Sequence, residues 1–144
     1  MEWTQLAVKN HFTASSVMVR RELLEQVGGF DTELHGPEDY DLWLRVTEMT
    51  RSAVLDSELV GYREVPGSLG RRARSMERGL ARVLAKMDER AVWGKRSVLR
   101  RKARSYCKFS CAYMYTTSGE HFHAMHRLVA SLLLYPWPYR RNEV

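Results

Sequence analysis

Three carboxylic acids, Glu38, Asp39 and Asp41, stand within four positions at the start of an apolar run in the stretch HGPEDYDLWLR. The preceding Pro37 suits the first turn of a helix, because a residue there needs no backbone N–H for the helical hydrogen-bond pattern. Leucines, a tryptophan and a valine follow at spacings that continue the helix to about Thr50. The sequence therefore predicts a helix whose first turn carries three acids.

Carboxylates at a helix start can serve three purposes. They can complement the positive end of the helix dipole and cap free N–H groups, an effect worth under ~1 kcal/mol each. An acid beside the apolar Trp43 can instead have a shifted pKa and act as a general base toward a sugar hydroxyl. Asp39 and Asp41 together could also hold a hard cation, which prefers carboxylate oxygens. The residues by themselves leave these three interpretations open.

The net charge of +6 conceals a strong asymmetry along the 144 residues. Residues 1–70 hold 6 Lys/Arg and 12 Asp/Glu, whereas residues 71–104 hold 13 Lys/Arg and 3 Asp/Glu. The basic middle could bind the phosphates of a nucleic acid or an anionic membrane. The chain shows no nucleic-acid-binding motif and no aromatics interleaved with the cations, so we expect no nucleic-acid partner. A solvated helix face is the plainer interpretation, and a membrane-facing helix is the alternative.

The front of the chain combines features of strands and helices. The segment Thr13–Val19 is rich in β-branched residues and predicts a strand, and two extended pieces are expected at 52–55 and 58–63. After the strand, leucines at helical spacing following Arg21 predict a short helix. This helix should end at Gly28–Gly29, since glycine commonly follows the last helical turn. With 44% hydrophobic residues, the chain is expected to form one globular core.

The back of the chain has the pattern of three helices. Hydrophobic residues at helical spacing predict one helix from Ser75 to about Ala91, and two more over residues 97–117 and 122–134. Pro136 should end the last of them, because proline cannot continue the helical hydrogen-bond ladder. The sequence therefore predicts a mixed α/β front followed by a helical back.

The two cysteines, Cys107 and Cys111, fall four residues apart in a predicted helix. Side chains at this spacing point the same way along the helix axis, which favours two reduced thiols in the core over a disulfide. Reduced thiols indicate a reducing compartment. The N-terminal stretch has no basic region followed by an apolar run, and no apolar run is long enough to span a bilayer. We therefore expect a cytoplasmic protein.

Several motifs occur in an order that resembles family-2 glycosyltransferases of the GT-A fold. A strand with small hydroxyl residues leads into Arg20–Arg21 and a short helix, which is followed by Gly28–Asp31 (GGFD), a loop and Glu38–Arg45 (EDYDLWLR). The later LVGYREVPGSLG resembles the Tyr-Arg-x-His-Pro-x-Ser segment of the family. Ordered matches over about fifty residues are far more specific than any single motif.

The resemblance implies a role for each matching residue. Asp39 matches the catalytic base, which would deprotonate the acceptor hydroxyl as that oxygen attacks the anomeric carbon with inversion. Glu38 matches its partner, which places the acceptor or the base. Asp41 and Arg45 match a structural pair that orients the helix. The remaining matches are an acceptor-side loop of Gly28, Gly29 and Phe30, and an arginine facing the diphosphate leaving group, Arg63.

Two features depart from the family pattern. Val65 stands where the family often has histidine. Only about twelve residues precede the first predicted strand, so the nucleotide-binding half with its Asp-x-Asp pair is expected to be missing. We therefore expect no metal site in this chain. A divalent cation, Mg²⁺ or Mn²⁺, would belong to the donor half.

These inferences together predict an α/β fold, a partial GT-A-like layer of the nucleotide-diphospho-sugar transferase type, followed by a helical C-terminal region. Residues 1–70 would form the acceptor-side part, and residues 71–144 a basic helix and a helical hairpin. The expected function is inverting transfer of a sugar from a nucleotide sugar to a hydroxyl acceptor in polysaccharide synthesis, incomplete without a donor-binding half. The alternative is a non-catalytic remnant or interaction module, with a basic helix facing the inner side of a membrane. An uncovered sheet edge would also invite a homo-oligomer.

Overall fold

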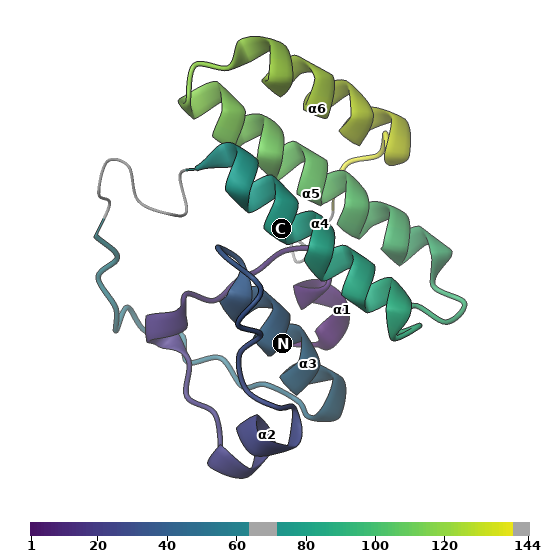
Figure 1. Ribbon diagram of the computed structural model, residues 1–144. Helices are drawn as coiled ribbons and strands as arrows, with labels where there is room; N and C mark the ends of the chain where they lie inside the picture. The colour runs from purple at the N-terminus through teal and green to yellow at the C-terminus, as the bar shows by residue number, and fades with distance from the viewer. Residues whose placement is uncertain (64–71, 140–144) are drawn as a thin grey trace.

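The computed structural model describes residues 1–63 and 72–139, and the regular structure in these two ranges is helical throughout. Figure 1 shows the chain from its N-terminus in purple to its C-terminal part in yellow. The elements are α1 (Trp3–Leu6), the 3-10 helix η1 (Ala14–Ser16), α2 (Arg21–Gln26), α3 (Glu38–Met49), α4 (Ala73–Glu89), α5 (Ser97–Thr117) and α6 (His121–Leu134).

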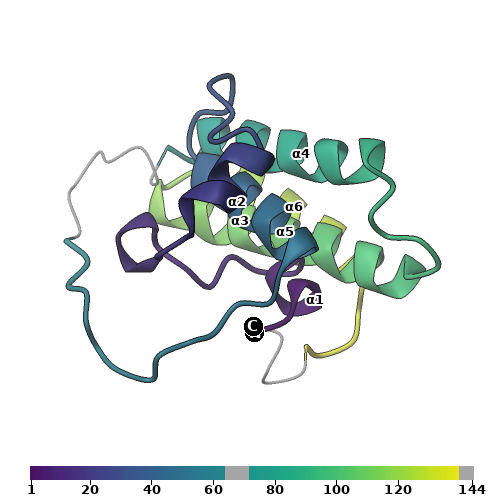
Figure 2. The same cartoon turned by 90° about the horizontal axis from the view of Figure 1, so that it is seen from below.

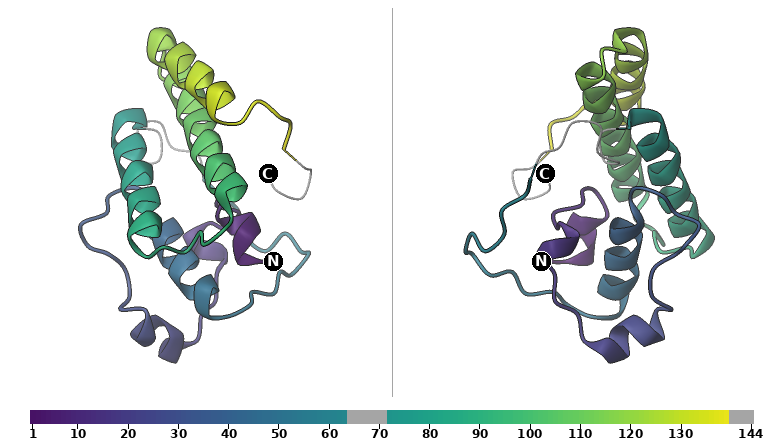
Figure 3. Two further views of the ribbon diagram at one scale, coloured as in Figure 1. Left: turned by 90° about the vertical axis from the view of Figure 1, so that its right-hand side faces the viewer. Right: turned by 60° about the vertical axis from the view of Figure 1, so that its left-hand side comes forward.

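The helices form two groups that meet at α4. The three long helices α4, α5 and α6 lie side by side, with α6 on the outside against α5 (Figures 1 and 3). Helix α3 packs against α4 and α1, while α2 lies at the end of the molecule far from α6. The segment 51–63 has no regular structure and runs as an open arc away from the helices (Figure 2).

The predicted α/β fold is wrong for the part of the chain that the structure describes. Residues 14–16 of the expected strand form η1, and neither 52–55 nor 58–63 forms a strand, although Ser52 is hydrogen-bonded to Met1. The backbone is extended at Val17 (φ −112°, ψ 134°) and Arg20 (φ −65°, ψ 137°), as β-branched composition favours. A strand also needs the N–H and C=O groups of a neighbouring strand. Extended backbone without such a neighbour gives no GT-A-like layer.

The predicted helices are confirmed. Helix α5 spans the expected residues 97–117, and α6 begins one residue before the expected start. Helix α2 ends where the glycines stand: Gly28 has φ +78°, and its N–H donates to the Glu25 carbonyl at 3.2 Å. The Gly29 N–H donates to the Leu24 carbonyl at 2.9 Å. These two bonds form the glycine-terminated helix end known as a Schellman motif, which satisfies carbonyls of the last helical turn.

The main core joins the front of the chain to the basic middle. Fully buried side chains from α1, α3 and α4 meet there: Leu6, Leu42, Leu44, Val83 and Met87. Helix α4 approaches the start of α3 closely at Gly79, where a Cβ atom would lie 2.4 Å from Cδ of Pro37. Only glycine permits this approach. The acids at the start of α3 are thus set directly against α4.

A second, smaller core lies among α4, α5 and α6, around the buried Cys111 and Tyr115. Helices α5 and α6 come close where Ser105 and Ser131 face each other, with the Ser131 hydroxyl donating to the Ser105 carbonyl at 2.8 Å. Small side chains at such a contact let two helices approach. Glu77 of α4 accepts hydrogen bonds from Arg127 of α6 at 2.5 Å and from Tyr115 of α5 at 2.9 Å. One carboxylate therefore ties all three long helices together.

Candidate functional site

Asp39 lies in the first turn of α3 and is half-buried. Its Oδ1 accepts a hydrogen bond from the backbone N–H of Tyr40 at 2.6 Å, which orients the carboxylate. Burial raises the pKa of Asp39 above its ordinary value, and the neighbouring Glu38 charge adds to this rise, against the opposing pull of the Tyr40 hydrogen bond. A carboxylate with a raised pKa is a stronger proton acceptor than a free aspartate, as general-base chemistry requires.

Asp39 faces a cavity of about 540 Å³ that lies between the front of the chain and the long helices. Its walls come from the segment 8–15, the start of α3, and one side each of α4 and α5. Apolar side chains predominate in the walls, among them Phe12, Met76, Leu80 and Leu84. A few polar groups in an apolar cavity of this size are typical of sites for small molecules.

Glu38 lines the same cavity, beside Asp39. Its Oε2 accepts a hydrogen bond from the Gly36 backbone N–H at 2.7 Å, so the side chain turns back over the loop before α3. This bond fixes the entry into the helix at a glycine with φ +115°. The two carboxylates of the Glu-Asp motif are therefore brought together at one cavity wall.

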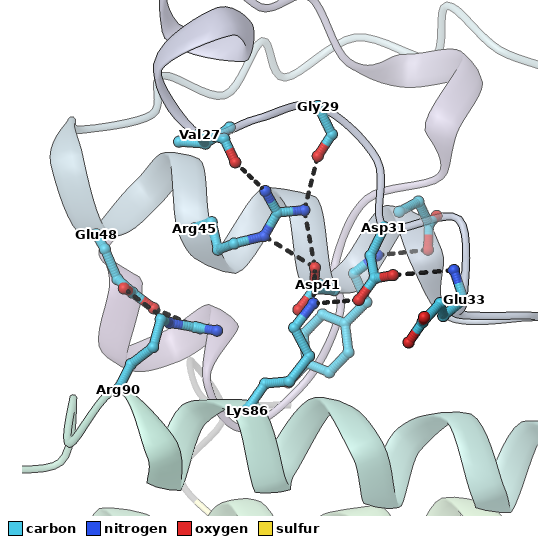
Figure 4. Close-up of polar contacts among 11 residues, drawn as sticks. Val27, Gly29, Asp31, Glu33, Asp41, Arg45, Glu48, Lys86 and Arg90 are labelled. Atoms are coloured by element: carbon cyan, nitrogen blue, oxygen red, sulfur yellow. Dashed lines mark hydrogen bonds and ion pairs between the residues drawn. The ribbon is translucent and has the colours of Figure 1, made fainter.

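Asp41 has a different environment from Asp39, since it is fully buried and paired with two cations. Its Oδ2 lies 2.8 Å from Arg45 Nη2 and 2.9 Å from Lys86 Nζ of α4, and Figure 4 shows these residues together. Lys86 also lies 2.7 Å from Asp31, and its hydrogen bond lowers the pKa of that carboxyl group. The pair Asp41–Arg45 predicted from the sequence forms, and the structure adds Lys86 and Asp31 to it.

The same Arg45 holds the glycine loop that follows α2. Its guanidinium donates to the carbonyls of Val27 at 2.5 Å and Gly29 at 2.8 Å (Figure 4). Phe30 is half-exposed and lies edge-on to Trp43, with ring centroids 6.4 Å apart. The predicted acceptor-side loop Gly28–Phe30 is thus fixed to α3, but it is not part of the wall of the Asp39 cavity.

Arg63 is exposed, and it too stands outside the cavity wall, although its neighbour Tyr62 contributes to that wall. The rest of the segment that resembles the Tyr-Arg-x-His-Pro-x-Ser motif, including Val65 and Gly70, lies outside the described residues. The structure therefore brings together Glu38 and Asp39 of the predicted site residues. It does not bring Gly28, Gly29, Phe30 or Arg63 to the same cavity.

Helix α5 contributes a wall of this cavity that the sequence reasoning did not assign to the site. Ala103, Tyr106, Cys107 and Ser110 line the same cavity as Asp39. Their spacing of three, one and three residues places them on one helical face, and this is the signal that could have found them. Without knowing that α5 packs near the start of α3, however, the pattern indicates only a core-facing stripe.

Cys107 and Cys111 are both free thiols, as their spacing predicted. A hydrogen bond between the two lowers the pKa of Cys107, while the pKa of Cys111 rises because of that bond and its burial. Cys107 lines the Asp39 cavity, and Cys111 lies in the second core. The more acidic thiol is therefore the one beside the candidate site.

A larger groove of about 730 Å³ lies elsewhere, between the extended residues around Val17–Arg20 and the end of α3. Trp43 and Val46 form part of its floor. None of the predicted site residues lines it. Judged by volume alone, this groove would be the preferred ligand site. Chemistry that needs a base instead favours the smaller cavity, because Glu38 and Asp39 line it.

Within residues 1–63 and 72–139, no three His, Cys, Asp or Glu side chains gather closely enough to hold a metal ion. The interpretation of Asp39 and Asp41 as a cation pair does not fit their contacts, because Asp41 is occupied by Arg45 and Lys86. The assignment of Mg²⁺ or Mn²⁺ to a donor half stays a prediction.

A model of the glycosyltransferase-like family 2 matches residues 3–109 of the chain. The chain belongs to this family. The match spans the front of the molecule, α4 and more than half of α5, so it includes the whole Glu-Asp motif and, of the α5 residues that line the cavity, Ala103, Tyr106 and Cys107. Neither the curated proteins nor the solved structures include a significant match to the chain.

Proposed function

We propose that this member of glycosyltransferase-like family 2 provides the acceptor side of an inverting sugar transfer, with Asp39 as the general base. The observation that carries the proposal is the position of Asp39: a half-buried carboxylate with a raised pKa on the wall of a cavity large enough for a sugar. The family match supports glycosyl transfer as the reaction class, and the cavity supports this wall of the molecule as the place where the acceptor binds.

In this mechanism the acceptor hydroxyl lies against Asp39 in the cavity. The carboxylate takes the hydroxyl proton while the oxygen forms a bond to the anomeric carbon of the donor sugar. The bond from that carbon to the diphosphate oxygen breaks, and the nucleoside diphosphate leaves with the electron pair. Attack from the side opposite the leaving group inverts the configuration. Glu38, next to Asp39, positions an acceptor hydroxyl, and Tyr106 of α5 offers a ring against which a sugar can stack.

The nucleotide sugar and its divalent cation, Mg²⁺ or Mn²⁺, are assigned to a donor-binding unit outside the described residues. Two observations support this division. The described residues include no parallel sheet of the kind whose strand ends bind nucleotides, and they include no carboxylate cluster for a metal. Arg63 would face the diphosphate once donor and acceptor sites are joined.

The proposal is tested by measuring nucleoside diphosphate release with a panel of nucleotide sugars and hydroxyl acceptors, with the chain as the cell makes it. We expect the Asp39→Asn variant to lose about 10²-fold or more of the transfer rate, the size of a lost general base. Equal rates in the variant and the wild type would end the assignment of the base. Tight binding of a nucleotide sugar by residues 1–144 alone would end the division into donor and acceptor units.

The second candidate is a non-catalytic interaction module. The all-helical fold of the described residues favours it, because the sheet of a complete transferase is not seen there. In that case the Asp39→Asn variant keeps every function of the wild type, and no panel of donors and acceptors yields transfer.

A further inference from the structure

Helix α6 packs against α5 through small side chains and turns its large apolar side chains outward. Its inner face carries Ala124 and Ser131, which are 8% and 5% exposed. The large side chains recur at spacings of three, one or four residues, so they share one face of the helix. This face, here called the outer stripe, consists of Phe122, Met125, Leu128, Val129, Leu132 and Leu133.

The outer stripe is exposed along its whole length. Exposure ranges from 38% for Leu128 to 84% for Phe122, and Leu133 near the other end is 77% exposed. Scattered apolar residues on a surface need no explanation, but a contiguous apolar patch marks an interaction site. No Asp or Glu interrupts the stripe, since α6 contains neither residue.

The surroundings of the stripe are positively charged. Residues 97–139, which include α5 and α6, hold 6 Lys/Arg against the single acid Glu120. Four of these cations, Arg100, Arg104, Lys108 and Arg127, pair with Asp88 or Glu77 of α4, so the positive charge nearest the end of the stripe comes from Arg101 and Lys102. The cations gather where α5 begins, and Arg101 brings them to the end of α6 because its Nε donates to the Leu134 carbonyl at 3.0 Å. Just beyond α6, Trp137 is 69% exposed, and Lys102 lies over the ring of Tyr135 at 5.3 Å.

We propose that the outer stripe of α6 docks the protein onto an anionic membrane surface, with α6 lying in the plane of the lipid headgroups. An apolar helical face, flanking cations and an exposed tryptophan are the features by which a helix binds at a lipid interface. This inference does not depend on the proposed transferase activity.

The length of α6 requires that it lie on the membrane and not cross it. Its 14 residues span roughly 21 Å at about 1.5 Å per residue, less than the ~30 Å of a hydrocarbon core. No helix in the described ranges is long and apolar enough to cross a membrane.

Charge distinguishes a lipid surface from a second copy of the chain as the occupant. Pairing two outer stripes would bring two hairpins of net positive charge together, and like charges at short distance repel. An anionic surface instead attracts the same cations while it covers the apolar side chains. Six of the 13 cations in the basic middle, for which a membrane-facing role was the alternative, pair with a described carboxylate within the molecule: Arg74, Arg82, Lys86, Arg90, Arg100 and Arg104.

The test is cosedimentation of the full chain with phosphatidylcholine vesicles, with and without phosphatidylglycerol, at low and high salt. We expect binding to the anionic vesicles that weakens as salt rises, because screening reduces the attraction. Serine at both Leu132 and Leu133 should lower vesicle binding by roughly tenfold or more. A blue shift of tryptophan emission on binding should vanish in Trp137→Phe, since Trp43 and Trp93 are already buried and Trp3 is packed against the main core.

A matched control is available on another surface. Leu55 and Leu59 are 76% and 73% exposed in the open arc 51–63, so serine at both makes the same chemical change away from α6. This control should bind vesicles like the wild type, and far-ultraviolet circular dichroism should be unchanged in both double variants. No binding by the wild type, or equal binding by both double variants, would overturn the proposal. So would a dimer in sedimentation that the α6 variant abolishes without any vesicle binding.

Discussion

Asp39 and Asp41 stand two positions apart in α3 and have opposite environments. Asp39 faces a cavity with one backbone N–H on its carboxylate, whereas Asp41 is enclosed with two cations. A residue on one face of a helix meets solvent or substrate, while a residue about 200° further round meets the core. The same residue type can therefore provide a proton acceptor at one position and a structural anchor at the other.

The raised pKa of Asp39 predicts a pH dependence of both activity and stability. A base must be ionised, so the rate of transfer should fall with acid at a pH above the ordinary pKa of aspartate. Because the folded state disfavours the ionised form, Asp39→Asn should melt at the same temperature as the wild type or higher at neutral pH. A pH–rate profile and thermal melts check both. A marked loss of stability in Asp39→Asn would show that the carboxylate has a structural role.

Asp41→Asn should cause a severe loss of stability. The change leaves Arg45 at a buried site without its counter-charge and Lys86 with Asp31 as its one remaining carboxylate, and breaking such a buried pair costs about 3–5 kcal/mol. Urea unfolding measures the loss. Glu48→Gln is the matched control, because its pair with Arg90 is partly exposed and should contribute below ~1 kcal/mol. Equal losses in the two variants would contradict the anchoring role of Asp41.

At the scale of elements, the contact of α4 with the start of α3 depends on one glycine. In an ordinary helix Gly→Ala stabilises by roughly 1 kcal/mol, but at Gly79 the added Cβ would meet the Pro37 ring at 2.4 and 2.7 Å. We expect Gly79→Ala to destabilise the protein by about 1–3 kcal/mol, the cost of overpacking. Thermal or urea unfolding checks this.

Gly61→Ala is the control for that prediction, since a Cβ there meets nothing within 4 Å. Displacement of Pro37 should also move Glu38 and Asp39, so Gly79→Ala should reduce transfer more than Gly61→Ala does. A Gly79→Ala variant as stable as the wild type would show that the two helices can separate at no cost.

Element prediction from the sequence succeeded where the signal is local and failed where it is not. The bounds of α5 and the end of α2 follow from nearby spacing and from Gly28. The strand expected at Thr13–Val19 is extended in part, but sheet formation depends on a distant partner that local composition does not reveal. The wall that α5 provides to the Asp39 cavity was missed for the same reason: it arises from packing between segments far apart in the sequence.

At the scale of the whole molecule, cations of the basic middle (residues 71–104) form ion pairs with acids of other segments and so hold those segments together. Lys86 joins α4 to Asp31 in the glycine loop, and Arg90 joins the end of α4 to Glu48 of α3. Asp88 accepts hydrogen bonds from Arg100 and Arg104 of α5, and the Arg100 bond above all lowers its pKa. The charge asymmetry of the sequence is thus partly neutralised within the fold, which the charge count alone could not show.

Glu77 gives this arrangement a measurable pH dependence. Burial opposes its ionisation, but hydrogen bonds from Arg127, Tyr115 and Lys108 outweigh that effect and lower its pKa to about 2. A carboxyl group whose folded pKa lies below its unfolded value stabilises the fold above the unfolded pKa. That stabilisation is lost as pH falls toward the folded value. Acid should therefore loosen the joint among α4, α5 and α6 between about pH 4.5 and about pH 2.

The Glu77→Gln variant should be less stable than the wild type at neutral pH, by on the order of 3 kcal/mol. Between neutral pH and pH 2 the variant should lose less stability than the wild type, because the variant already lacks the stabilisation that the ionised Glu77 carboxylate provides. Urea unfolding at several pH values measures both effects. Glu89→Gln is the control, since the exposed pair of Glu89 with Arg82 should change stability little at any pH. If Glu77→Gln and the wild type lost the same stability in acid, other carboxylates would govern the acid sensitivity, and the three long helices would owe their joint to apolar packing alone.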